Sequence, residues 1–259
     1  MEENMLTANY LHEVFCEIME CSMFDEDVFQ IRSYDDIDFA KKMKKIGMEP
    51  DEEKALEMSA VLYPKGNKVV LYTNQTQLDL NPYVAMELIF AKLFDVYKSQ
   101  MPAYISTYNS VKNFLRFKNV SNAFEIWTSF CTNFFAIKIL KNLFDEDSPY
   151  SEEELIPHLE TLLSEMKNNE DYSAEEKFNA LLYVFSNFMA YEPEINSPVQ
   201  SMHNLKKIKI RDMTPLVGEE LGKLYNEFYQ ELFFTVKASC SLSNMLKINK
   251  KANKIIKTL

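Results

Sequence analysis

One acidic residue, Glu87, lies in an otherwise apolar stretch of this 259-residue chain. Residues 83–94 are apolar on nearly every side of a helix, which is typical of a helix buried on most of its faces. Burying a carboxylate there costs on the order of several kcal/mol unless it is paired or hydrogen-bonded. Glu87 therefore needs a polar partner, a wet cleft or a chemical role, and burial without a cation would raise its pKa.

A second group with metal-ligand spacing is the HExxC pattern from His12 to Cys16. A His and a Cys at i and i+4 project from one helix face and could share a metal ion. Val14 and Phe15, however, belong to the apolar stripe of the same predicted helix. We therefore interpret the segment as an amphipathic N-terminal helix with His12 at its edge.

The composition excludes several classes of site. Three histidines, and four cysteines without a CxxC pair, provide little for zinc or imidazole chemistry. The four glycines form neither G-x-G-x-x-G nor G-x-x-x-x-G-K-[ST], which excludes those nucleotide-binding loops. We expect no cofactor and no bound metal.

The elements that must position Glu87 follow from the spacing of apolar residues and turn residues. In chain order we predict a helix over 6–21, a short strand near 28–31, a helix over 38–46, a hairpin of strands 59–63 and 68–73, a polar loop over 74–80, the helix over 81–100, and a second buried helix over 122–143. The fold class is therefore α+β and predominantly helical, with a small sheet packed on a helical core and an all-helical C-terminal region. The polar segment DEDSP at 145–149 predicts a division into residues 1–145 and 150–259.

This order of elements resembles zincin metallopeptidases of the ImmA/IrrE-like family. In that family the helix after the sheet carries H-E-x-x-H, whose two histidines bind zinc from one helix face while the glutamate polarises the bound water. The pentapeptide at this place is MELIF, residues 86–90, and the stretch FEIWTSFCTNFFA, residues 124–136, is similar to the family's second helix. The resemblance covers about residues 1–145, the predicted zincin-like domain.

The sequence departs from this family at each position that would hold the metal. Met86 and Phe90 replace the two histidines, and Ser129 and Asn133 stand where acids are expected. A thioether and a phenyl ring cannot replace two imidazoles, so Glu87 has no activated water to deprotonate. The resemblance thus implies a pseudoenzyme with a vestigial site formed by Met86, Glu87, Phe90, Ser129 and Asn133.

These observations favour a non-catalytic protein-interaction factor on a degenerate metallopeptidase scaffold. The resemblance implies a phage or mobile-element setting, with a regulatory or defence protein as the partner. One alternative is an acidic inhibitor or decoy of a nucleic-acid-binding enzyme, an anti-defence role, because residues 1–200 carry a net charge of −17. A third is an enzyme that gathers further carboxylates around Glu87.

The C-terminal part of the chain is basic, with a net charge of +6 over residues 201–259. Five lysines follow a basic amphipathic pattern near the end: Lys247, Lys250, Lys251, Lys254 and Lys257. They form either an interaction surface or the outer face of a final helix docked on the acidic body. No nucleic-acid-binding motif accompanies them, so we do not expect nucleic acid as a partner.

The localisation follows from two absences in the sequence. No apolar run reaches the roughly 20 residues of a membrane span, and the acidic start lacks the basic region of a signal peptide. We expect a soluble cytoplasmic protein that makes no membrane contact.

Overall fold

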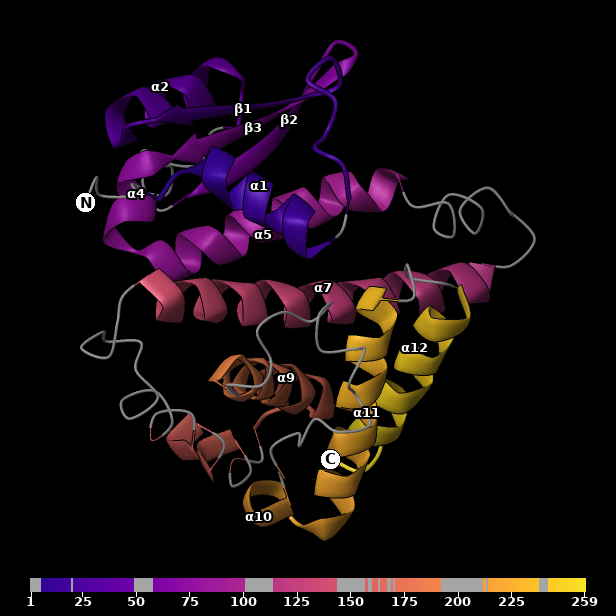
Figure 1. The fold of residues 1–259 in the computed structure, drawn as a ribbon. Coiled ribbons are helices and arrows are strands. Elements are labelled where there is room, and N and C mark those ends of the chain that lie inside the picture. The colour runs from indigo at the N-terminus through magenta and orange to yellow at the C-terminus, as the bar shows by residue number, and fades with distance from the viewer. Residues whose placement is uncertain are drawn as a thin grey trace. The chain divides into compact units, whose positions relative to one another are not determined.

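The computed structural model describes residues 6–19, 21–48, 58–100, 114–143, 171–191, 214–237 and 242–259, together with Asp212 and short pieces between 157 and 169. The chain forms two compact units, Met1–Tyr97 and Lys98–Leu259, and each is described by itself. The architecture is α+β and predominantly helical (Figure 1), which confirms the predicted fold class. None of the helices in the described ranges combines the length and the apolar character that a membrane crossing needs.

The first unit contains a three-stranded mixed sheet. Its strands are β1 (Phe29–Tyr34), β2 (Ala60–Lys65) and β3 (Lys68–Asn74), in the spatial order β1-β3-β2. β1 runs parallel to β3, and β2 pairs with β3 in the antiparallel direction, so the predicted hairpin is present. Gly66 supplies the positive φ of 63° at the hairpin turn, a conformation that glycine adopts without steric cost.

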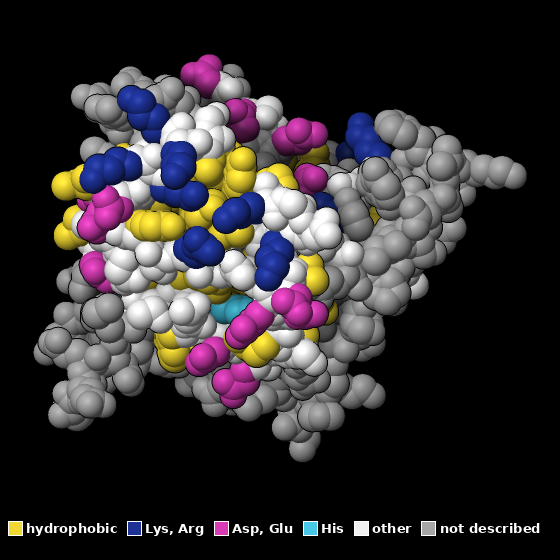
Figure 2. Space-filling model, turned by 90° about the horizontal axis from the view of Figure 1, so that it is seen from above, with side chains coloured by type: hydrophobic (Ala, Val, Ile, Leu, Met, Phe, Trp, Pro, Cys, Tyr) yellow, Lys and Arg dark blue, Asp and Glu magenta, His cyan; other side chains and the backbone are white. Residues whose placement is uncertain are grey.

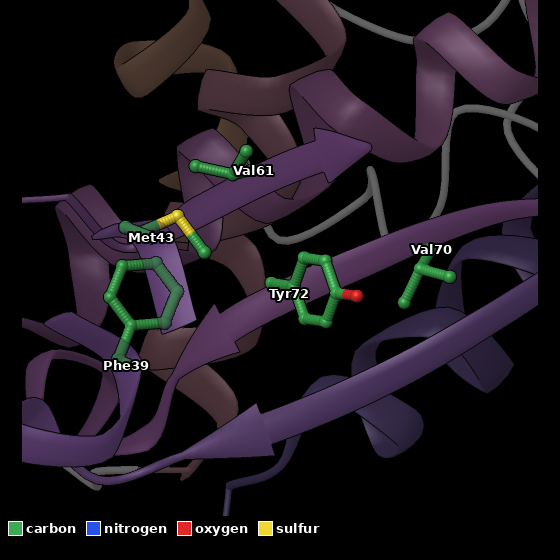
Figure 3. Close-up of a cluster of buried hydrophobic side chains, with 5 residues drawn as sticks. All are labelled: Phe39, Met43, Val61, Val70 and Tyr72. Atoms are coloured by element: carbon green, nitrogen blue, oxygen red, sulfur yellow. The ribbon is translucent and has the colours of Figure 1, made fainter. Parts of the chain in front are cut away.

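Helix α2 (Asp36–Lys45) covers one face of this sheet (Figure 1). The Asp35 side chain caps its N-terminus by accepting a hydrogen bond of 2.8 Å from the backbone N–H of Asp38. Gly47, with φ 68°, ends the helix where the sequence predicts a stop. The shared core consists of side chains from α2, β2 and β3 (Figure 3): Phe39, Met43, Val61, Val70 and Tyr72.

Helices α1 (Ala8–Ile18) and α5 (Pro82–Gln100) lie on the other face of the sheet (Figure 1). Phe15 of α1 is fully buried and meets the ring of Phe94 of α5 edge to face, with ring centroids 4.9 Å apart. This aromatic packing joins the two helices, and it holds α5, which carries Glu87, in place.

The predicted polar loop over 74–80 is instead a short helix, α4 (Gln75–Leu80). Asn74, at the end of β3, accepts a hydrogen bond of 3.2 Å from the backbone N–H of Gln77 and so caps this helix. The amide of Asn74 also donates to Asp36 of α2 at 2.6 Å. The side chain of one buried residue therefore links the end of β3 to both helices.

The second unit is helical throughout its described residues. Its longer described helices are α7 (Phe114–Leu143), α9 (Ala174–Tyr191), α11 (Glu219–Lys237) and α12 (Leu242–Ile256), with a single turn, α10 (Thr214–Val217), before α11. α7 packs against α9 and α12, and α12 also packs against α11. A capping box precedes α9, since the Ser173 hydroxyl accepts from the Glu176 N–H at 3.3 Å and the Ser173 N–H donates to the Glu176 carboxylate at 2.8 Å.

The division between the two units falls after Tyr97, within α5. The physical reason is that α7 makes its helix packing contacts with α9 and α12 of the second unit. Residues 145–149 themselves lie outside the described residues. The residues of the predicted vestigial site consequently belong to two different units.

Candidate functional site

Helix α5 positions Glu87 at the boundary between a buried and an exposed face. Pro82 is its first residue, where the missing N–H costs no intrahelical hydrogen bond. Residues on the buried face recur every three or four positions: Ala85, Met86, Ile89, Phe90 and Leu93. Glu87 lies beside this face and is partly buried.

The immediate partner of Glu87 is Tyr83, one helical turn earlier. The Tyr83 hydroxyl donates a hydrogen bond of 3.1 Å to the Glu87 carboxylate. Desolvation by burial raises the pKa of Glu87 to about 7, although the Tyr83 hydrogen bond acts in the opposite direction by favouring the charged form. The sequence predicted this rise for a buried carboxylate without a cation. Sequence analysis did not identify Tyr83 as the partner of Glu87, although their i, i+4 spacing on one helix could have indicated it.

The two positions that would hold a metal in the resembled family are filled with apolar packing. The Met86 and Phe90 side chains are fully buried. The ring of Phe90 stacks on Phe15 of α1, with centroids 6.4 Å apart. Among the described residues, no group of three or more His, Cys, Asp or Glu side chains could hold a metal ion. Glu87 therefore lies in the helix between two side chains that are packed in the apolar core.

Ser129 and Asn133, the other two residues of the predicted site, lie one turn apart on α7. Asn133 is buried, and its amide donates a hydrogen bond of 2.9 Å to the backbone carbonyl of Ser129. Thr132 donates to the same carbonyl at 3.1 Å. Ser129 and Asn133 are thus hydrogen-bonded to each other within the second unit. Met86, Glu87 and Phe90 are neighbours on α5 within the first unit.

An exposed apolar row runs along α4 and α5, and sequence analysis did not single it out. Its members, spaced four residues apart, are Leu80, Val84 and Leu88, with exposed fractions of 68%, 51% and 36%. Val84 and Leu88 lie on one side of α5, next to Glu87, since residues at i and i+4 share a helix face, whereas Leu80 ends α4 just before the break at Asn81. We call Leu80, Val84 and Leu88 the α5 row.

The five C-terminal lysines divide into two groups on α12 and just beyond it. Lys251 forms an ion pair of 3.2 Å with Glu231 of α11 and donates to the carbonyl of Glu227 at 2.9 Å, and Lys247 lies 3.6 Å from Glu231. The remaining three, Lys250, Lys254 and Lys257, are exposed. The opposite side of α12 is buried through Met245, Ile248, Ala252 and Ile255. Two of the lysines thus take part in docking α12 on α11, and three present charge to solvent.

His12 of the HExxC pattern packs as an aromatic residue. It is buried, and its ring lies 4.8 Å from that of Phe24 and 5.4 Å from that of Phe29. Burial lowers its pKa, because the charged imidazolium loses hydration. Both neighbours belong to the core next to α1, which agrees with the interpretation of this segment as an amphipathic helix.

Comparisons of the chain with protein-family models, with curated proteins and with solved structures gave no match.

Proposed function

We propose that this chain is a non-catalytic protein-binding factor on a metallopeptidase-like scaffold. The observation that carries the proposal is the full burial of Met86 and Phe90, the side chains on either side of Glu87 at the positions of metal ligands. Neither a thioether nor a phenyl ring in such packing presents the nitrogen or carboxylate oxygen that zinc prefers. Without a metal-bound water to deprotonate, Glu87, whose pKa is raised to about 7, has no catalytic role in this proposal.

The order of elements supports the scaffold part of this proposal. A helix, a strand, a second helix and a hairpin precede α5, with only the short α4 in between. The helix after the sheet thus carries the glutamate, as in the family that the sequence resembles. The phage or mobile-element setting and the regulatory or defence partner remain part of the proposal through that resemblance.

The α5 row supports binding to a protein. Three large apolar side chains exposed close together in the sequence are costly in water and are typical of a surface that a partner covers. They lie beside a carboxyl that burial drives toward its neutral form, so the surroundings favour an apolar partner surface over a cation. The proposed partner is a protein that presents an apolar groove or patch to Leu80, Val84 and Leu88.

Metal analysis tests the non-catalytic part of the proposal. We expect only trace zinc in the purified protein, before and after incubation with the ion. Stoichiometric zinc in the natural chain, with proteolysis that chelation stops, would end the proposal.

Affinity capture from cells that naturally contain the protein tests the binding part. Replacing Val84 and Leu88 together by Gln should weaken capture of the partner about tenfold or more, because two apolar side chains lose their buried area. A matched variant on the other candidate surface, Lys250→Glu with Lys254→Glu, should capture the partner as the natural chain does. The reverse pattern would assign binding to α12 and contradict a role for the α5 row.

The acidic inhibitor or decoy is the second candidate function, and it is supported by the net charge of −17 over residues 1–200. The face seen in Figure 2 does not carry this charge as one surface, since Lys and Arg side chains lie across its middle and Asp and Glu side chains toward its margins. Competition with nucleic acid for a basic enzyme, lost at high salt, would favour this candidate over the first.

A further inference from the structure

The C-terminal end of α1 brings two cysteines together. The backbone N–H of Cys21 donates a hydrogen bond of 3.0 Å to the carbonyl of Cys16, five residues earlier. α1 ends at Ile18 with Met19 as its C-cap. Cys16 is therefore the third-last residue of the helix, and Cys21 is the second residue after the cap. A hydrogen bond of this span is part of the Schellman motif, in which a contact between the side chains at these two positions is frequent.

A backbone hydrogen bond of the same span is present at the end of α2. There the N–H of Met48 donates to the carbonyl of Met43 at 3.1 Å, and Gly47 donates to Lys44 at 3.1 Å. At α2 the two equivalent positions hold methionines. At α1 they hold cysteines, Cys16 and Cys21.

The two thiols differ in exposure and in acidity. Cys16 is buried, with 4% of its surface exposed, whereas Cys21 is partly exposed. The neighbouring Cys16 thiol lowers the pKa of Cys21, and the Cys21 thiol together with burial raises the pKa of Cys16. A more acidic, more accessible thiol beside a buried one is the arrangement of an attacking and a resolving cysteine.

We propose that Cys16 and Cys21 form a redox-active dithiol, which a low-molecular-weight disulfide converts reversibly into an intramolecular Cys16–Cys21 disulfide. The backbone hydrogen bond of 3.0 Å between Cys21 and Cys16 holds the two residues close together, as a disulfide requires. The proposal does not depend on the protein-binding function proposed above.

The reaction proceeds by two thiol–disulfide exchanges. The Cys21 thiolate attacks one sulfur of the oxidant RSSR, which forms a mixed disulfide and releases one RS⁻. The Cys16 sulfur then attacks the Cys21 sulfur, the second RS⁻ leaves, and the Cys16 proton passes to it. Two protein thiols are oxidised to one disulfide, and one RSSR is reduced to two RSH.

Peptide mapping of the folded, full-length protein tests the proposal. The protein is exposed to oxidised glutathione in native buffer, its remaining thiols are alkylated, and the chain is cleaved after glutamates. This cleavage separates residues 14–17, which contain Cys16, from residues 21–26, which contain Cys21. We expect these two peptides to be joined by a disulfide that dithiothreitol breaks, while the buried Cys131 remains a thiol. Two free thiols in these peptides under conditions that oxidise the unfolded chain would overturn the proposal.

Two matched variants test the roles of the two sulfurs. Cys16→Ser should trap Cys21 as a stable mixed disulfide that carries the mass of one glutathione, because no resolving thiol remains. Cys21→Ser should leave Cys16 unmodified, because that thiol is buried. Trapping on Cys16 in place of Cys21 would contradict the assigned roles. Mapping of the natural chain decides the proposal even where a variant folds poorly.

Discussion

Replacing Glu87 by Gln should stabilise the first unit at pH 8 by about 3 kcal/mol, or roughly a hundredfold in its unfolding equilibrium. At pH 4 the same variant should match the natural chain. Gln keeps an oxygen that accepts the hydrogen bond from the Tyr83 hydroxyl, which lies 3.1 Å from the Glu87 carboxylate, but it carries no charge at any pH.

The sign follows from the direction of the pKa shift. Burial raises the pKa of Glu87 from 4.5 to about 7. Below pH 4.5 the carboxyl is neutral in the folded and the unfolded chain, so its burial carries no charge penalty. Between pH 4.5 and 7 the unfolded chain releases the proton first, and stability falls until the folded carboxyl also ionises. This loss of stability reaches its full value above about pH 7. The Glu87→Gln variant does not show it.

Hydrogen exchange of the β3 amides measures this effect, because it reports the opening of the first unit separately from the second. Asp95→Asn is the matched control, since Asp95 is an exposed carboxylate on the same helix. It should leave the pH dependence unchanged. Burial lowers the pKa of His12, so the natural chain should also lose stability below pH 6.5. The Glu87→Gln and Asp95→Asn variants should show the same loss. Equal pH slopes for the natural chain and Glu87→Gln would show that Glu87 is hydrated in the folded state.

Local patterns in the sequence were enough to predict most elements of the first unit. The hairpin was predictable because Gly66 lies in a turn between two segments of strand-forming residues. Gly47 likewise marked the end of α2. α4 was missed because its six residues are mainly polar and carry no apolar period. It forms because the Asn74 side chain caps it and is itself held by Asp36, a contact 38 residues away in the sequence.

The candidate site was predictable only within single helices. Spacing placed Met86, Glu87 and Phe90 on one helix, and the apolar surroundings of Glu87 predicted the direction of its pKa shift. The i, i+4 pair Ser129 and Asn133 likewise lies on one helix, but no local pattern gives the distance between side chains on separate helices. Cys16 and Cys21 were not predicted as a pair, because their contact arises from the backbone turn after α1 and not from a cysteine motif.

Replacing Phe15 by Ala should have the largest effect on the first unit, a loss of about 4 kcal/mol. Phe15 is fully buried on α1, and four aromatic rings surround it: Phe24, Phe90, Phe94 and Tyr97, with centroids between 4.9 and 6.4 Å away. Three of these rings come from α5. Truncation therefore removes the transfer free energy of the ring and leaves a cavity between α1 and the helix that carries Glu87.

Phe15→Leu separates the loss of volume from the loss of aromatic contacts, and it should cost about 1–2 kcal/mol, because the leucine fills part of the cavity. Tyr10→Ala, at an exposed position on the same helix, should change stability by less than about 0.5 kcal/mol. Because α5 is held by this packing, Phe15→Ala should also speed exchange at the α5 amides relative to those of α2. Equal effects of Phe15→Ala and Tyr10→Ala would mean that α1 does not hold α5, and the fixed surroundings of Glu87 would then need another cause.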